Sequence, residues 1–132
     1  MGDTLRITTE ALHWIMAEAD ASQDEICGLL LGDPALAIAC RNVHPDPSRF
    51  FEIDPAALLR AHRRSRLGHG EVVGFYHSHP SGWAYPSEGD AAGAEPDGAI
   101  WLIVAGNQAG AWRAVADGPV HGRFQPLSLI MT

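Results

Sequence analysis

The segment EICGLLLG, residues 25–32, constrains the fold of this chain more than any other part of its sequence. From Ile26 onward it is almost continuously apolar, and it ends in glycine. An apolar run of this length is too short for a helix and is typical of a strand buried on both faces of a sheet. The sequence therefore predicts a central β-strand here, with the carboxylate of Glu25 at its entry.

The rest of the chain is predicted to alternate further strands with helices. Helices are expected at residues 9–19, at residues 55–67 after an Asp-Pro cap, and briefly from Ser87. Further strands are expected at residues 5–7, 35–43, 50–53, 71–79, 100–105, 109–116 and 121–127. Two or three helices around a mixed sheet of six to eight strands define an α/β or α+β fold. A length of 132 residues fits one domain with one core, over residues 1–132.

Charge and composition exclude several classes of function. The formal net charge of −7 argues against a nucleic-acid binder, because phosphate contacts need a basic surface. No apolar stretch reaches the roughly 18 residues that span a bilayer, and the start MGDTLRITTE lacks the pattern of a signal peptide. Two cysteines are too few for a disulfide scaffold. We therefore expect a cytoplasmic protein with no nucleic-acid or membrane partner. Its oligomeric state is not indicated by any of these features.

The segment HSHPSGWAYPSEGD, residues 77–90, carries the pattern most typical of a metal site. Residues two apart in a strand point to the same face, so His77 and His79 aim both imidazoles at one point. Pro80 ends the strand, and the following turn brings Asp90 back as a third ligand. Two histidines and one carboxylate leave one tetrahedral position open, which distinguishes a catalytic zinc from a structural one. The pattern predicts one catalytic Zn²⁺.

A zinc hydrolase also needs a group that takes a proton and returns it to the leaving amine. Glu25 is the candidate general base, because a carboxylate at the entry to an apolar strand is costly without a partner or a role. Ser87 is a helix cap three residues before Asp90, and its hydroxyl could donate to the oxyanion. The alternatives are a plain surface carboxylate at residue 25 and a simple Ser-x-x-acid capping box, which is compatible with ligation.

The pattern His-x-His-Pro, six residues, Ser, two residues, Asp resembles the JAMM motif of the JAB/MPN metalloproteases. It is fulfilled here at His77, His79, Pro80, Ser87 and Asp90. The upstream Glu25-x-Cys-Gly-Leu-Leu-Leu-Gly block is similar to the Glu-bearing strand of the family. The resemblance covers most of the chain and implies an MPN (JAB) fold, in which a mixed curved β-sheet is flanked by two or three helices.

The resemblance also implies a zinc metallopeptidase that hydrolyses peptide or isopeptide bonds. Short bacterial members are similar to enzymes that cut after the Gly-Gly tail of a ubiquitin-like or sulfur-carrier protein, which is therefore the implied substrate. The tail would add a strand at a sheet edge, with room only for glycine beside the cleaved bond. A non-catalytic MPN scaffold that holds zinc for stability or docking remains the alternative. A deaminase would need a Pro-Cys-x-x-Cys segment, which is absent, and cell-wall cleavage would need export.

Other residues leave two interpretations open. Cys27 either lines the site or is a small buried core residue. Trp83 and Tyr85 either form a wall for the substrate or pack their own loop. A basic cluster is either a solvated helix face or a surface that steers an acidic carrier; its members are Arg60, Arg63, Arg64 and Arg66. Ser78 points away from its neighbouring histidines and is expected to be structural, and the remaining histidines have no motif partners.

Overall fold

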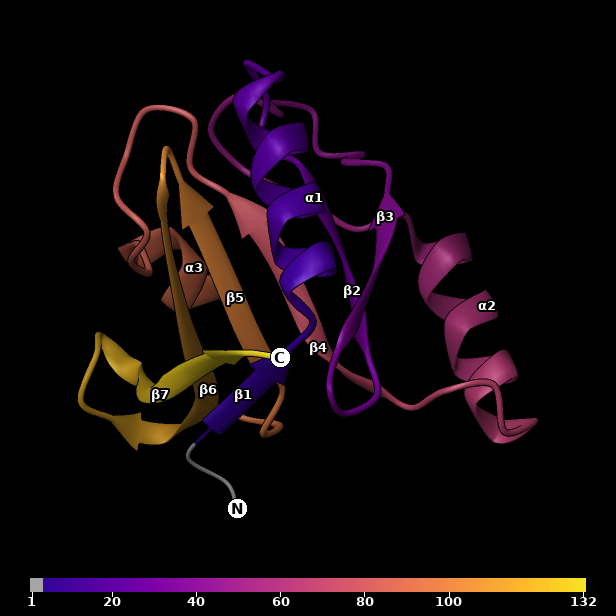
Figure 1. The fold of residues 1–132 in the computed structure, drawn as a ribbon. Helices are drawn as coiled ribbons and strands as arrows, with labels where there is room; N and C mark the ends of the chain where they lie inside the picture. Colours follow the sequence, from indigo (N-terminus) through magenta and orange to yellow (C-terminus); the bar gives the residue numbers. More distant parts are fainter. Residues whose placement is uncertain (1–3) are drawn as a thin grey trace.

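The computed structural model describes residues 4–132, which form a curved mixed sheet of seven strands and three helices (Figure 1). The strands are β1 (Thr4–Ile7), β2 (Cys27–Leu31), β3 (Leu36–Cys40), β4 (Val72–Ser78), β5 (Ile100–Ala105), β6 (Gln108–Gly118) and β7 (Gly122–Met131). The helices are α1 (Thr9–Asp20), α2 (Pro55–Arg66) and α3 (Glu88–Gly93). The predicted fold class is confirmed. Within the described residues, none of these helices has the length and apolar character needed to cross a membrane.

The sheet curves until its two edges almost meet. Its strand order is β1-β7-β6-β5-β4-β2-β3, with β1 parallel to β7, β4 parallel to β5, and the other neighbours antiparallel. Ile7 at the end of β1 forms an isolated bridge with Ala35, which directly precedes β3. The Ala35 N–H donates to the Arg6 carbonyl at 2.7 Å. The first and last strands of the order are therefore joined at one end.

Strand β5 lies at the centre and is buried along its whole length, because both faces of the sheet are covered. Side chains alternate between the faces of a strand. Leu102 packs in one core with Leu12 of α1, whereas Ile103 packs in a second core on the other face, the face that α3 covers. Strand β4 follows the same alternation, with Tyr76 in the α1 core and His77 on the face of α3. His77 thus comes from a strand that is packed on both faces.

The predicted strand at residues 50–53 is wrong. Of these residues only Ile53 pairs, in an isolated bridge with Asn42. The Asn42 side chain supplies the partners that a neighbouring strand would have offered. Its amide nitrogen donates to the Phe50 carbonyl at 2.9 Å, and its oxygen accepts from the Glu52 N–H at 3.1 Å. One half-buried amide therefore organises a loop where the apolar pattern suggested a strand.

Two strands extend beyond their predicted limits. Strand β6 runs over Gln108–Gly118 and β7 over Gly122–Met131. The extra length of β7 pairs with β1, where Leu5 lies opposite Leu129 in a parallel ladder. Pairing between the two ends of the chain leaves no local pattern in the sequence, which explains why the end of β7 was predicted too early.

Candidate active site

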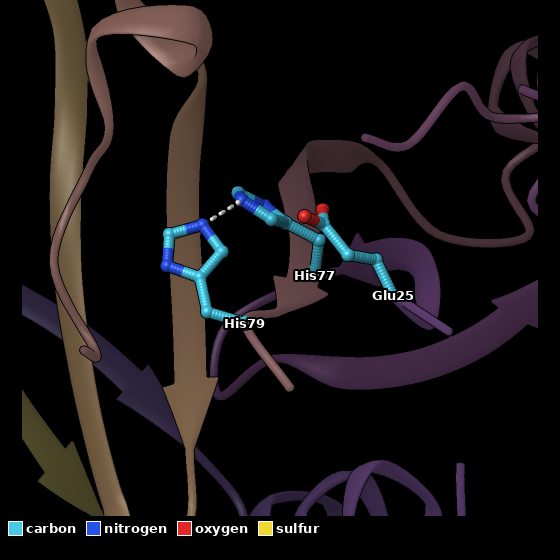
Figure 2. Close-up of side chains that lie close together, drawn as sticks. All are labelled: Glu25, His77 and His79. Atoms are coloured by element: carbon cyan, nitrogen blue, oxygen red, sulfur yellow. Dashed lines mark hydrogen bonds between the residues drawn. The ribbon is translucent and has the colours of Figure 1, made fainter. Parts of the chain in front are cut away.

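The carboxyl end of β4 presents two imidazoles to the same space. His77 lies within β4, and His79 follows one residue after its end. The backbone keeps the strand register there, because the His79 N–H still donates to the Val104 carbonyl of β5 at 3.0 Å. The two Nε2 atoms are 3.2 Å apart. Figure 2 shows both rings, with the carboxylate of Glu25 beside them.

Helix α3 brings the third predicted ligand to the histidines. Ser87 caps this helix, with its Oγ accepting from the Asp90 N–H at 2.9 Å, while the Ser87 N–H donates to Asp90 Oδ2 at 3.0 Å. The predicted capping box is therefore present. Asp90 Oδ1 lies 3.2 Å from His77 Nε2, and Oδ2 lies 3.1 Å from His79 Nε2. The cap thus fixes the carboxylate that faces both imidazoles.

His77, His79 and Asp90, which we call the triad, offer donor atoms that suit a zinc ion. Zinc with N and O ligands at 2.0–2.1 Å in tetrahedral geometry separates neighbouring ligand atoms by about 3.3 Å. His77 Nε2 lies 3.2 Å from His79 Nε2, and Asp90 faces the two imidazoles with different oxygens, Oδ1 at 3.2 Å from His77 Nε2 and Oδ2 at 3.1 Å from His79 Nε2. A second combination shares the histidines but uses Glu25, whose ligand atom lies within 4.8 Å of both imidazoles.

Glu25 lies two residues before β2 and is held by its backbone. Its N–H donates to the Pro47 carbonyl at 2.8 Å, and its own carbonyl accepts from the Asn42 side chain at 2.9 Å. The residue is only 6% exposed, and its Oε1 has no hydrogen-bond partner among residues 4–132. A buried carboxylate oxygen without a partner is costly. In Figure 2 the carboxylate lies beside His77.

Ser78 joins the segment of Glu25 to the segment of the histidines. Its Oγ accepts from the Ile26 N–H at 2.9 Å, and its own N–H donates to the Ile26 carbonyl at 3.1 Å. The side chain is buried and points away from the imidazoles. The prediction that Ser78 is structural is confirmed, and its contacts extend the pairing of β2 with β4 up to the site.

Burial changes the protonation of Glu25. Desolvation raises the pKa of its carboxyl from 4.5 to about 7; the neighbouring His79 opposes this rise and Asp90 adds to it. A carboxyl with a pKa near neutral pH can both accept and release a proton under physiological conditions. This property suits a group that shuttles protons.

The triad itself favours a cation. Burial would raise the pKa of Asp90, but hydrogen bonds from His77 and His79 outweigh it and hold this pKa well below its usual range. Burial lowers the pKa of His77, whereas for His79 the opposing effect of burial is outweighed by hydrogen bonds with Asp90 and the Trp83 carbonyl, which raise its pKa. The site therefore combines an ionised carboxylate with one neutral imidazole and one that tends to hold a proton. A metal cation would supply the same positive charge.

The metal-free protein is expected to lose stability as pH rises through the range in which Glu25 ionises. The folded state holds this proton up to about pH 7, whereas an unfolded chain releases it near 4.5. The contribution of Glu25 to stability should therefore be constant below pH 4.5 and fall by about 3 kcal/mol by pH 8. Glu25→Gln should remove this slope, and the exposed Glu10→Gln should keep it. Urea denaturation of chelator-treated protein at several pH values measures both; parallel curves for Glu25→Gln and wild type would contradict the prediction.

Two hollows flank the triad and meet beside Ser87. The first has a volume of about 620 Å³ and is lined by Glu25 and the loop of residues 80–86. The second, of about 400 Å³, contains Asp90 and an aromatic group formed by Phe50, Phe51, Phe75 and Trp101. Ser87 and Arg49 line both. A substrate chain that crossed the triad would therefore have one half in the first hollow and the other half in the aromatic second hollow.

The loop of residues 80–86, which lines the first hollow, also bonds one of the histidines through its backbone. The Trp83 carbonyl lies 2.7 Å from His79 Nδ1. Because a carbonyl only accepts, Nδ1 carries a proton, so Nε2 is the nitrogen that would bind a metal. Tyr85 packs edge-on against Trp112. Trp83 is 78% exposed on this loop, which favours the interpretation that its ring forms a wall for the substrate. Tyr85 both lines the hollow and packs its own loop.

The remaining predicted residues lie away from the hollows. The Cys27 Sγ faces the carbonyls of Cys40 and Arg41 at 3.7 and 3.6 Å, and burial raises the pKa of its thiol to about 12. It lines neither hollow, which favours a core role. The basic side chains of α2 are exposed and likewise lie outside both hollows.

Two residues that support the site were missed from the sequence. Asn42, which holds Glu25, could have been found from its position before a proline-rich segment, where a side-chain amide often organises a turn. Phe51 stacks on His77 with ring centroids 4.2 Å apart. It carries no such signal, because an aromatic residue in an apolar pair is also typical of an ordinary core.

Comparison with known proteins identifies a family and several relatives. Residues 8–116 match the family of prokaryotic homologues of the JAB domain. The chain is 33% identical to a desampylase from Pyrococcus furiosus over 113 residues, which cover 84% of this chain and 79% of that protein. It is 43% identical over 49 residues to a probable TtuB-protein conjugate cleaving protease from Thermus thermophilus, covering 37% of this chain and 33% of the relative.

Solved structures share the fold. A protein from Desulfitobacterium hafniense superimposes with a TM-score of 0.80 at 22% identity, covering 97% of this chain and 92% of that one. A JAB1/MPN domain protein from Archaeoglobus fulgidus gives a TM-score of 0.54 at 21% identity, with coverages of 96% and 98%. With its sequence match over residues 8–116, this chain belongs to the family of prokaryotic homologues of the JAB domain and has the JAB/MPN fold.

Proposed function

We propose that this chain is a zinc-dependent metallopeptidase that cleaves the peptide or isopeptide bond after the Gly-Gly tail of a ubiquitin-like or sulfur-carrier protein. The observation that carries the proposal is the meeting of His77, His79 and Asp90 at zinc-ligand spacing beside the buried carboxylate of Glu25. The substrate class draws support from relatives named desampylase and TtuB-protein conjugate cleaving protease.

In this proposal His77, His79 and Asp90 hold the metal. A bound Zn²⁺ supplies a Lewis acid that polarises the scissile carbonyl and activates water near neutral pH. Glu25 accepts the proton of the attacking water at its carboxylate and then gives it to the leaving nitrogen. Its pKa of about 7 suits both steps, because an acid–base catalyst works best with a pKa near the working pH.

Ser87 is proposed to stabilise the oxyanion. Its Oγ already accepts the Asp90 N–H, which leaves the hydroxyl proton available as a donor. The residue lines both hollows, so its hydroxyl lies where a chain would pass between them. A donor fixed in place before the reaction stabilises developing charge without reorganisation.

We infer a direction for the bound substrate from the position of Glu25. The leaving nitrogen must come within reach of the group that protonates it, and Glu25 lines only the first hollow. The leaving side, which is a lysine stem in an isopeptide, therefore lies in the first hollow beside Trp83. The carrier tail then lies in the second hollow, over Phe50 and Phe51.

Two carrier fusions test the proposal. One bears a linear extension after Gly-Gly, and the other is joined through Gly-Gly to a lysine side chain. Zinc-loaded protein should release the intact carrier from at least one of them, read by intact mass, and a carrier ending in Ala-Ala should stay uncut. No cleavage of either fusion by protein with verified zinc would refute the substrate class.

Trp83→Ala is expected to lower kcat/KM for an isopeptide-linked conjugate by about tenfold. The exposed indole would be buried against the lysine stem, and losing that contact removes about 1–2 kcal/mol. Zinc affinity should not change, because the carbonyl that holds His79 belongs to the backbone. Trp14→Ala, at an exposed tryptophan of α1, is the matched control. Equal rates for the two variants would exclude Trp83 from the leaving-group side.

A further inference from the structure

The two histidines of the triad are held in different ways. His79 donates its Nδ1–H to the Trp83 carbonyl at 2.7 Å. His77 is fully buried, yet its Nδ1 has no hydrogen-bond partner within the described part of the chain. Metal-binding histidines almost always have such a partner, because it fixes the orientation of the ring. Among the described residues, contacts with the faces and edges of the ring are what can orient His77.

Aromatic rings enclose the His77 side chain. Phe51 lies against it with centroids 4.2 Å apart and planes 19° from parallel, and Trp101 meets it at 5.5 Å and 89°. Phe51 and Trp101 also contact each other, at 5.8 Å. Rotation of the imidazole would drive it into one of these rings, and interiors of this density resist such movement. The packing thus restricts the plane that directs Nε2 toward Asp90.

We propose that Phe51 is a positioning residue for the metal ligand His77, its ring replacing the hydrogen bond that His77 lacks. Phe51 comes from the loop after Asn42, and Asn42 also bonds the carbonyl of Glu25. A single loop therefore supports a metal ligand through a ring and the general base through an amide. The inference rests on the proposed function only in requiring that His77 bind a metal.

Three variants separate positioning from general packing. Phe51→Leu keeps apolar bulk but removes the ring, and Phe51→Tyr keeps the ring. Phe50→Leu removes a neighbouring ring that packs on His44 rather than on a member of the triad. Zinc affinity is measured by competition with a chelator, the ligand geometry by the visible spectrum of the Co²⁺-loaded protein, and packing by urea denaturation of the metal-free form.

Phe51→Leu is expected to lose about 10–100-fold in zinc affinity, the usual effect of removing a group that orients a ligand. Its cobalt spectrum should also change. Phe51→Tyr and Phe50→Leu should match wild type in both measurements, even where urea denaturation shows some loss of stability. If Phe51→Leu does not fold, Phe51→Met serves in its place.

Unchanged zinc affinity and cobalt spectrum in Phe51→Leu would overturn the inference, as would an equal loss in Phe51→Tyr. Failure of the proposed function gives a different result. Wild-type protein that binds zinc without cutting any carrier fusion, while Phe51→Leu still shows weakened binding, would refute the peptidase and leave the positioning role intact. Wild-type protein that binds no zinc would overturn both.

Discussion

Glu25→Gln is expected to reduce cleavage of a Gly-Gly carrier fusion by about 10²–10⁴-fold, the range attributed to general acid–base catalysis. Glutamine has nearly the same shape but cannot accept the proton at residue 25. The three proposed zinc ligands are not altered, so the variant should bind zinc with unchanged stoichiometry. Single-turnover cleavage followed by intact mass, with zinc measured in the same sample, checks both expectations.

The exposed Glu10→Gln on α1 is the matched control for this charge change and should cleave like wild type. A Glu25→Gln rate within tenfold of wild type would remove Glu25 from the chemistry. The experiment also tests the scaffold alternative. A domain that keeps zinc only for docking would show no cleavage in wild type, so there would be no activity for the substitution to abolish.

Asp90→Asn is expected to lower zinc affinity by more than about 100-fold and to abolish cleavage with it. The Asp90 oxygens lie 3.2 and 3.1 Å from the two imidazoles, and the substitution puts a neutral amide in their place. It also weakens the capping box that holds α3. Since a metal ligand contributes more than a group that only orients one, the effect should exceed the 10–100-fold typical of supporting residues.

Glu88→Gln provides the comparison for Asp90→Asn, because Glu88 is an exposed carboxylate in the first turn of the same helix. It should retain zinc after dialysis against a chelator. The two combinations of ligands give opposite outcomes. If Asp90→Asn kept its zinc and Glu25→Gln lost it, the metal would be held by Glu25 with the two histidines, and the proposed roles of the two carboxylates would have to be exchanged.

Features with a local cause were predictable from the sequence. The apolar run after Glu25 becomes β2, whose first four residues are buried. The capping box of Ser87 and Asp90 also forms as expected, since all its atoms lie within one helical turn. In each case the physical cause acts between residues close together in the chain, so a period or a spacing records it.

Features that depend on distant pairing were not predictable. Strand pairing sets Cys27 opposite His77, and this register brings the preceding Glu25 near the imidazoles. Nothing in either segment alone specifies that partner. The loop containing Phe51 forms no strand, and the Asn42 side chain takes the place of a strand partner for the Phe50 carbonyl and the Glu52 N–H. The role of the Trp83 carbonyl is equally hidden, since every residue has one.

The hydrogen bonds between Ile26 and Ser78 make assembly of the site depend on folding of the chain. They join residues 52 positions apart, so the groups assigned to hydrolysis become neighbours only after β2 has paired with β4. Contacts of such long range form late, because a large loop must first be closed. A chain still emerging from the ribosome, or one that has partly unfolded, would thus carry every residue of the site without the ability to cut its neighbours.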